Sequence, residues 1–177
     1  MKISRILAES DTDKNKPGIY KSHCYGPVYD QLFKSFKKQE RIKLIEIGTD
    51  RGASLLAWRK FFPNAVITGV DIEDKVEKKE EDIEYIISDV KDLKISWDFD
   101  IVIDDGSHKM KDVLYTVQNF RLKRGGIMIL EDCQAPGHWQ KAIKEVTDYT
   151  MEAIDLRGVY DKHDDFLIVL RNYGYTK

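Results

Sequence analysis

The sequence predicts an α/β fold: a seven-stranded, mostly parallel sheet with helices on both faces and an antiparallel last strand. Short apolar runs alternate with amphipathic stretches along the 177 residues, as in parallel sheets covered by crossover helices. Only a loop separates the final two apolar runs, which favours their pairing as an antiparallel hairpin at the sheet edge. The predicted strands cover residues 42–47, 65–70, 83–88, 99–104, 127–130, 151–156 and 166–170.

Apolar residues at helical spacing fill the intervals between these strands. After a polar opening segment, a helix is expected to begin at Pro27, because proline suits the first helical turn. A second helix lies between the turn at 48–52 and Pro63, a third covers 109–122 and a fourth covers 142–146.

Composition indicates one domain over residues 1–177, with a core built from 42% hydrophobic residues. The net charge is -2, so no basic excess suggests a nucleic acid or an anionic membrane as partner. No segment approaches the roughly twenty apolar residues that cross a bilayer. The chain opens without the apolar run of a signal peptide, and its two cysteines make no disulfide framework, so we expect a cytoplasmic protein.

Two of the predicted strands run directly into carboxylates. Asp105 follows the strand at 99–104, and Glu131 and Asp132 follow the strand at 127–130. Neighbouring parallel strands lie about 4.8 Å apart, so these acids would crowd at one sheet edge and repel one another unless a cation lay between them. Their oxygens favour Mg²⁺, with Mn²⁺ as the alternative, and both acids of the second pair can bind only if the strand has already turned. The alternative is that one of them faces water or a helix N-terminus.

His108 is the candidate general base. It stands three residues after Asp105, so a turn entering the next helix could bring both side chains to one cavity, with Asp105 serving the catalysis. An imidazole that is neutral at cellular pH accepts a hydroxyl proton, and a metal stabilises the emerging alkoxide. The alternative is that His108 only caps the helix. The other three histidines have less support as catalysts.

A glycine loop follows the first predicted strand and favours a nucleoside ligand other than a dinucleotide. Gly48 and Gly52 allow backbone to approach a ligand closely, although both could be mere turn formers. Asp50 stands where a dinucleotide fold places its middle glycine, and its charge would obstruct a pyrophosphate. A cationic adenosyl ligand has no such conflict.

S-adenosylmethionine fits the acids at the strand ends. In a doubly wound sheet, ligands bind outside the carboxyl ends of the strands. We assign Asp71 to the ribose hydroxyls, Asp89 to the adenine amino group and Glu46 to the methionine amine. Asp104, at the end of its strand, is counted with this cofactor group. The alternative for Asp71 and Asp89 is a solvated acid that ends a strand.

Several motifs resemble the metal-dependent sugar O-methyltransferases, a family that includes macrolide-sugar enzymes of the mycinamicin pathway and, more distantly, rhamnosyl O-methyltransferases. The similarity covers residues 10 to 135, and the seven-strand layout matches the class I methyltransferase Rossmann-like fold. The motifs are Thr12-Asp13-Lys14 with His23, Tyr25 and Tyr29, then Glu46-Ile47-Gly48 with Gly52-Ala53-Ser54, then Asp104 to His108, and Glu131-Asp132.

The resemblance implies an S-adenosylmethionine-dependent O-methyltransferase that acts on a sugar hydroxyl. It implies magnesium at Asp105, Glu131 and Asp132, proton removal by His108, and assembly into a homo-oligomer. The opening segment, residues 1–25, would form a lid with Lys14 or Tyr25 near the cofactor, or these two would merely pack.

Three other functions compete with this prediction. A non-catalytic S-adenosylmethionine-binding module or partner subunit would need no base. Catechol-type small-molecule O-methyltransferases are similar in the Glu46 to Thr49 loop and also place a base three positions after a metal aspartate. A nicotinamide oxidoreductase shares the fold class but not the glycine loop.

Overall fold

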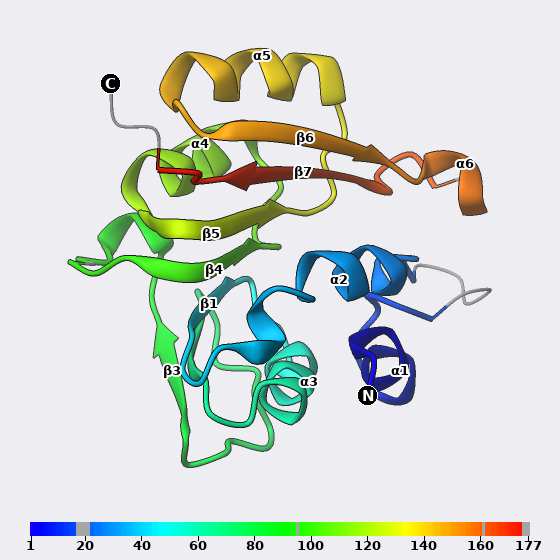
Figure 1. Ribbon diagram of the computed structural model, residues 1–177, viewed down its shortest axis with the longest axis vertical. Coiled ribbons are helices and arrows are strands. Elements are labelled where there is room, and N and C mark those ends of the chain that lie inside the picture. Colours follow the sequence, from blue (N-terminus) through cyan, green and yellow to red (C-terminus); the bar gives the residue numbers. More distant parts are fainter. Residues whose placement is uncertain (17–21, 95, 161, 175–177) are drawn as a thin grey trace.

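One sheet of seven strands organises the described part of the chain, which in the computed structural model is residues 1–16, 22–94, 96–160 and 162–174. The order is β3-β2-β1-β4-β5-β7-β6, and β7, red in Figure 1, lies antiparallel between β5 and β6. The other pairs are parallel. The predicted fold class and the terminal hairpin are therefore confirmed. The strands are β1 Lys43–Ile47, β2 Val66–Asp71, β3 Ile83–Ile87, β4 Phe99–Asp104, β5 Leu122–Leu130, β6 Thr150–Asp155 and β7 Phe166–Arg171.

Helices cover both faces because the strand residues alternate between two apolar clusters. In β4, Ile101 and Ile103 pack with α1, α2 and α3, whereas Val102 packs with α4 and α5 on the opposite face. The helices are α1 Ile3–Glu9, α2 Gly26–Leu32, α3 Ala53–Phe61, α4 Met110–Asn119, α5 Pro136–Val146 and the short α6 Arg157–Tyr160, with 3-10 turns η1 Phe36–Lys38 and η2 Val90–Asp92. No helix within the described ranges has the length and apolarity of a membrane span.

The expectation of a polar opening segment is wrong. Residues 3–9 form α1, which buries Ile3, Ile6 and Leu7 completely against the cluster shared with α2 and α3. Their spacing is helical, but a helix of seven residues gives only one repeat of the pattern. The N-terminal segment is thus anchored to the sheet by its own apolar face.

Two element boundaries also differ from the prediction. α5 begins at Pro136, six residues before the predicted start at 142. The third predicted helix, 109–122, ends earlier, because α4 stops at Asn119 and β5 begins at Leu122, so Gly125 and Gly126 lie inside a strand. The register with β4 shifts between Phe99 and Ile101, and Gly125 has φ +81°, so the glycines form an irregularity in the strand.

The central strands end level with one another. In the register of the sheet Ile47 of β1 lies beside Asp104 of β4, and Asp104 lies beside Leu130 of β5. The next residue on each strand continues this row, with the Asp105 N–H donating to the Ile47 carbonyl at 2.9 Å and the Glu131 N–H to the Asp104 carbonyl at 3.0 Å. The acids predicted to bind metal therefore leave the two strands side by side.

Candidate active site

A cavity of ≈ 1200 Å³ lies at the carboxyl ends of the strands. Eight of the predicted site residues line it: Lys14, Gly48, Asp71, Asp89, Asp104, Asp105, His108 and Asp132. The remaining predicted residues, Glu46, Gly52, Tyr25 and Glu131, are not among its lining residues. The structure thus gathers most of the predicted site around one space.

The glycine loop after β1 touches the loop after β4. A Cβ added at Gly48 would lie 2.1 Å from the Asp105 carbonyl oxygen, and Gly48 has φ +81°. Both facts require glycine here, because any side chain would clash with backbone and strain the left-handed conformation. Gly52, with φ +79°, precedes the first turn of α3. The loop therefore serves both as cavity wall and as a spacer between strands.

Asp71 at the end of β2 braces this loop. Its Oδ2 accepts the N–H groups of Thr49 at 2.9 Å and Asp50 at 2.8 Å, and its Oδ1 accepts the N–H of Glu73 at 3.1 Å. Asp89, which follows β3, caps η2 by accepting the Lys91 N–H at 2.9 Å. This bond and the Lys91 ammonium lower the pKa of Asp89. Both acids thus present acceptor oxygens at the cavity wall.

Asp105, His108 and Asp132 bring their ligand atoms within 4.8 Å of one another. His108 Nε2 lies 3.9 Å from Asp105 Oδ1 and 4.0 Å from Asp132 Oδ2. His108 and Asp132 have φ values of +51° and +55°, a conformation that non-glycine residues adopt at a cost and often at functional sites. The turn at Asp132 also lets two consecutive residues, Glu131 and Asp132, face this end of the sheet.

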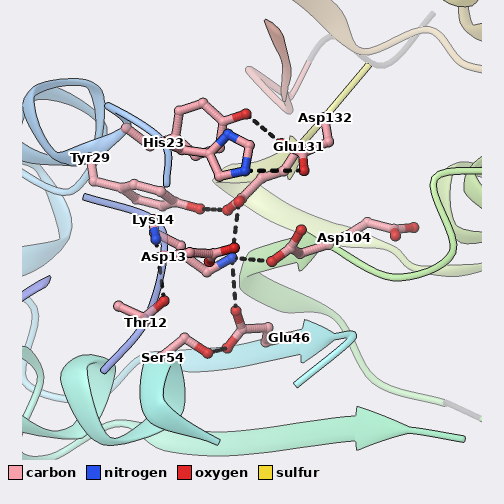
Figure 2. A network of polar contacts seen from close by, with 12 residues as sticks. Thr12, Asp13, Lys14, His23, Tyr29, Glu46, Ser54, Asp104, Glu131 and Asp132 are labelled. Carbon is pink, nitrogen blue, oxygen red and sulfur yellow. Dashed lines mark hydrogen bonds and ion pairs between the residues drawn. The ribbon is translucent and has the colours of Figure 1, made fainter. Parts of the chain in front are cut away.

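Lys14 reaches into the buried carboxylate cluster behind this group, as Figure 2 shows. Its Nζ lies 2.5 Å from Asp105 Oδ2, 2.9 Å from Glu131 Oε2 and 3.4 Å from Glu46 Oε1. Burial alone would lower the pKa of Lys14, but the charges of Asp105, Glu131 and Glu46 together hold it well above its ordinary value. A lysine ammonium thus lies between two of the acids for which the sequence predicted a cation.

Two tyrosines donate to the same cluster. The Tyr29 hydroxyl donates to Glu131 Oε1, and the Tyr25 hydroxyl donates to Asp132 Oδ1. Both oxygens of Glu131 are therefore engaged by protein groups, because Lys14 holds the other one. Burial raises the pKa of Glu131, and burial together with the charge of Asp105 raises that of Asp132. The assignment of Glu131 as a metal ligand stays a prediction.

Glu46 lies behind the cavity. Its Oε2 accepts hydrogen bonds from Ser54 Oγ at 2.7 Å and from Trp58 Nε1 at 2.9 Å, and burial raises its pKa. Its Oε1 has no hydrogen-bond partner among the described residues and faces the Lys14 ammonium at 3.4 Å. The proposed contact between Glu46 and a methionine amine stays a prediction, and in this structure the carboxylate serves Lys14.

Sequence reasoning gave little weight to His23, which lies beside Asp132. His23 Nδ1 is 2.5 Å from Asp165 Oδ1, and its Nε2 is 3.5 Å from Asp132 Oδ2. The ring also stacks on Tyr25, with centroids 4.7 Å apart. The only signal in the sequence was the spacing of His23, Tyr25 and Tyr29 before and within α2. Asp165, which precedes β7, carried no signal at all.

No family model matches the chain, but named relatives do. The chain is 29% identical over 164 residues to an 8-demethyl-8-alpha-L-rhamnosyl tetracenomycin-C 2'-O-methyltransferase of Streptomyces olivaceus. This match covers 77% of the chain and 43% of the relative. The chain is also 32% identical over 126 residues to the demethylmacrocin O-methyltransferase of Streptomyces fradiae, a match that covers 62% of the chain and 32% of the relative. This chain is therefore similar to proteins named as O-methyltransferases. It spans less than half the length of these relatives.

Solved structures support the same fold. The MycE methyltransferase from the mycinamycin biosynthetic pathway, in complex with Mg and SAH, superposes with a TM-score of 0.73 at 22% identity. The match covers 100% of this chain and 57% of that chain. The class I methyltransferase fold predicted from the sequence is therefore confirmed.

Proposed function

We propose that this chain transfers a methyl group from S-adenosylmethionine to a hydroxyl of a sugar or of a glycosylated small molecule, assisted by a divalent cation. One observation carries the proposal: a histidine and two carboxylates converge within 4.8 Å on the wall of a cavity that also exposes a glycine loop. The relatives' names support the acceptor class, since three of them name rhamnosyl or olivosyl compounds as the molecules that are methylated.

The cavity has room and chemistry for the cofactor. Its volume of ≈ 1200 Å³ exceeds the about 300–1,000 Å³ of a pocket for one small molecule, which leaves space for a second reactant. Asp71 and Asp89 offer acceptors to ribose and adenine, and Ile72, 69% exposed on the cavity wall, offers an apolar surface to a base. The many acids that line it favour a ligand with a cationic sulfonium.

The donor set also fits a hard divalent cation. Carboxylate oxygens are the ligands that Mg²⁺ prefers. Ligand atoms of Asp105 and Asp132 lie within 4.8 Å of each other, which is close enough for one cation to contact both. We assign Asp105 and Asp132 as ligands, with Glu131 joining them if it releases a present partner. Such a cation would stabilise the negative charge that develops on the acceptor oxygen.

His108 removes the hydroxyl proton in this proposal. Its side chain is 29% exposed, and its Nε2 lies 3.9 Å from Asp105 Oδ1 and 4.0 Å from Asp132 Oδ2. Asp105 orients the ring and stabilises the imidazolium that forms. The chain otherwise contributes by holding the acceptor oxygen in line with the methyl carbon, which accounts for much of the rate in such transfers.

Calorimetry and a coupled assay test this function. We expect S-adenosylmethionine to bind and NAD not to bind, and methyl rhamnoside with Mg²⁺ to give product. EDTA should abolish turnover while cofactor binding persists. Cofactor binding without turnover on any sugar or catechol would favour the binding-module alternative, and turnover on catechols alone would favour the catechol-type enzymes.

We also propose a domain organisation, a class of partner, a cellular location and an assembly for this protein. Residues 1–177 would act as one domain. Of the lid predicted over residues 1–25, the part that would cover the cavity is residues 11 to 14, which line it, whereas residues 17–21 lie outside the described residues. The balanced charge supports a small-molecule partner over nucleic acid or membrane, and the two cysteines suit the cytoplasm. The resemblance to the sugar enzymes supports a homo-oligomer, which light scattering would test.

A further inference from the structure

We propose that Lys14 is a built-in counterion of the active site, a positioning residue that holds Asp105 and Glu131 in place when no divalent cation is bound. The inference rests on the proposed function only in that the same carboxylates then take a metal. Lys14 would therefore stabilise the metal-free site and weaken the binding of the metal.

The position of Lys14 supports this role. Its side chain is buried and reaches acids that come from three strands, Glu46 in β1, Asp105 after β4 and Glu131 after β5. Ionised carboxylates in such a place are strongly destabilising unless a cation compensates them. Within the described residues, no lysine or arginine other than Lys14 makes an ion pair to this cluster. Without it the cluster would depend on an added cation.

Asp105 shows how the two cations relate. Its Oδ2 faces the Lys14 ammonium at 2.5 Å, whereas its Oδ1 faces His108 Nε2 at 3.9 Å within the candidate metal group. Lysine and metal would thus lie on opposite oxygens of one carboxylate. Glu131 adds competition, because its Oε2 is already held by Lys14 at 2.9 Å. Two neighbouring cations repel, so each should weaken the binding of the other.

The backbone fixes Lys14 in this place. The Tyr25 N–H donates to the Lys14 carbonyl at 2.9 Å, and the His23 N–H donates to the Asp13 carbonyl at 2.7 Å. Asn15 and Cys24 form an isolated antiparallel bridge beside these bonds. The lysine is therefore presented by a braced segment, as a positioning residue must be.

Thermal unfolding of Lys14→Met, in EDTA and in Mn²⁺, tests the inference. Methionine keeps much of the side-chain volume and removes the charge. In EDTA we expect a Tm about 10 °C below wild type, because buried acids lose their partner. Mn²⁺ should restore most of this loss, and its dissociation constant, measured by electron paramagnetic resonance, should fall about tenfold. Lys60→Met is the control, since Lys60 is 53% exposed and lies 3.8 Å from Glu9.

Two further variants test the inference if Lys14→Met does not fold. Lys14→Arg keeps the charge and should unfold in EDTA near the wild-type temperature. The double variant Lys14→Met/Glu131→Gln removes one negative charge with the positive one and should be more stable in EDTA than Lys14→Met. Folding of Lys14→Met only in Mn²⁺ would be the strongest support.

Three results would overturn the inference. The first is that Mn²⁺ raises the Tm of wild type and of Lys14→Met by the same amount. The second is that Lys14→Met binds Mn²⁺ more weakly than wild type, and the third is that the double variant has no higher Tm in EDTA than Lys14→Met. Failure of the proposed function is separable from these outcomes. If wild type bound no Mn²⁺, metal assistance would be discarded, and the comparison of variants in EDTA would still decide whether Lys14 is the counterion.

Discussion

The two halves of the cavity satisfy their acids in different ways. On the β2 and β3 side, Asp71 and Asp89 accept backbone N–H groups that lie within a few residues or on the adjoining loop. On the β4 and β5 side, Asp105, Glu131 and Asp132 are held by side chains from the N-terminal segment. The half that we assign to the cofactor, called the cofactor half, is thus built locally. The half that we assign to the metal, called the metal half, forms only when distant parts of the chain come together.

His108→Ala separates the two roles open to this residue in the metal half and should have the largest effect. If His108 is the base, turnover falls by about 10²–10⁴-fold, because proton removal is lost. Mn²⁺ and S-adenosylmethionine should bind as in wild type. His138→Ala, in an exposed position on α5, is the matched control. A large loss of Mn²⁺ affinity in His108→Ala would identify His108 as a ligand and remove it as the base.

His23→Ala tests how far the metal half depends on its distant supports. His23 lies 3.5 Å from Asp132 and is itself held by Asp165 at 2.5 Å. Loss of a group that orients a metal ligand costs about 10–100-fold in metal affinity, which is the fall expected for Mn²⁺. Cofactor affinity should not change. His163→Ala serves as control, and equal Mn²⁺ affinity in both variants would contradict the orienting role.

Asp71→Asn should affect only the cofactor half. An asparagine has one acceptor oxygen where aspartate has two, so it cannot accept hydrogen bonds from all three backbone N–H groups and from the ribose hydroxyls. S-adenosylmethionine should therefore bind about tenfold more weakly. Mn²⁺ affinity should stay as in wild type. Asp74→Asn, which alters a carboxylate more than half exposed, provides the comparison in the same calorimetric titration. Loss of metal binding in Asp71→Asn would show that the halves are not separate.

Tyr29→Phe should have the smallest effect and act on stability. It removes the hydroxyl that donates to Glu131 Oε1 and leaves that buried oxygen without its partner. The expected loss in the free energy of unfolding is about 1–3 kcal/mol, measured by urea denaturation in EDTA. Tyr173→Phe, at a side chain 54% exposed, should change nothing. An unchanged stability for Tyr29→Phe would mean that Glu131 finds another donor.

The same contrast explains what could be predicted from the sequence. The strand-end acids and the glycine loop are local patterns, and the structure places Asp71, Asp89, Asp105 and Asp132 on one cavity as expected. The partners of the metal half are separated from it by 91 residues for Lys14 and Asp105 and by 107 for Tyr25 and Asp132. Electrostatic reasoning predicted a cation among the acids, but charge alone does not distinguish an ammonium from a metal ion.

Gly48 fixes how the halves can move. With only a hydrogen atom allowed between its α-carbon and the carbonyl of Asp105, the two loops are in direct backbone contact. Neither can slide toward the other, and both start from strands joined in register. In the proposed reaction, the distance from the sulfonium to the acceptor oxygen would therefore be set by the spacing of β1 and β4. It would not depend on the closing of a mobile loop.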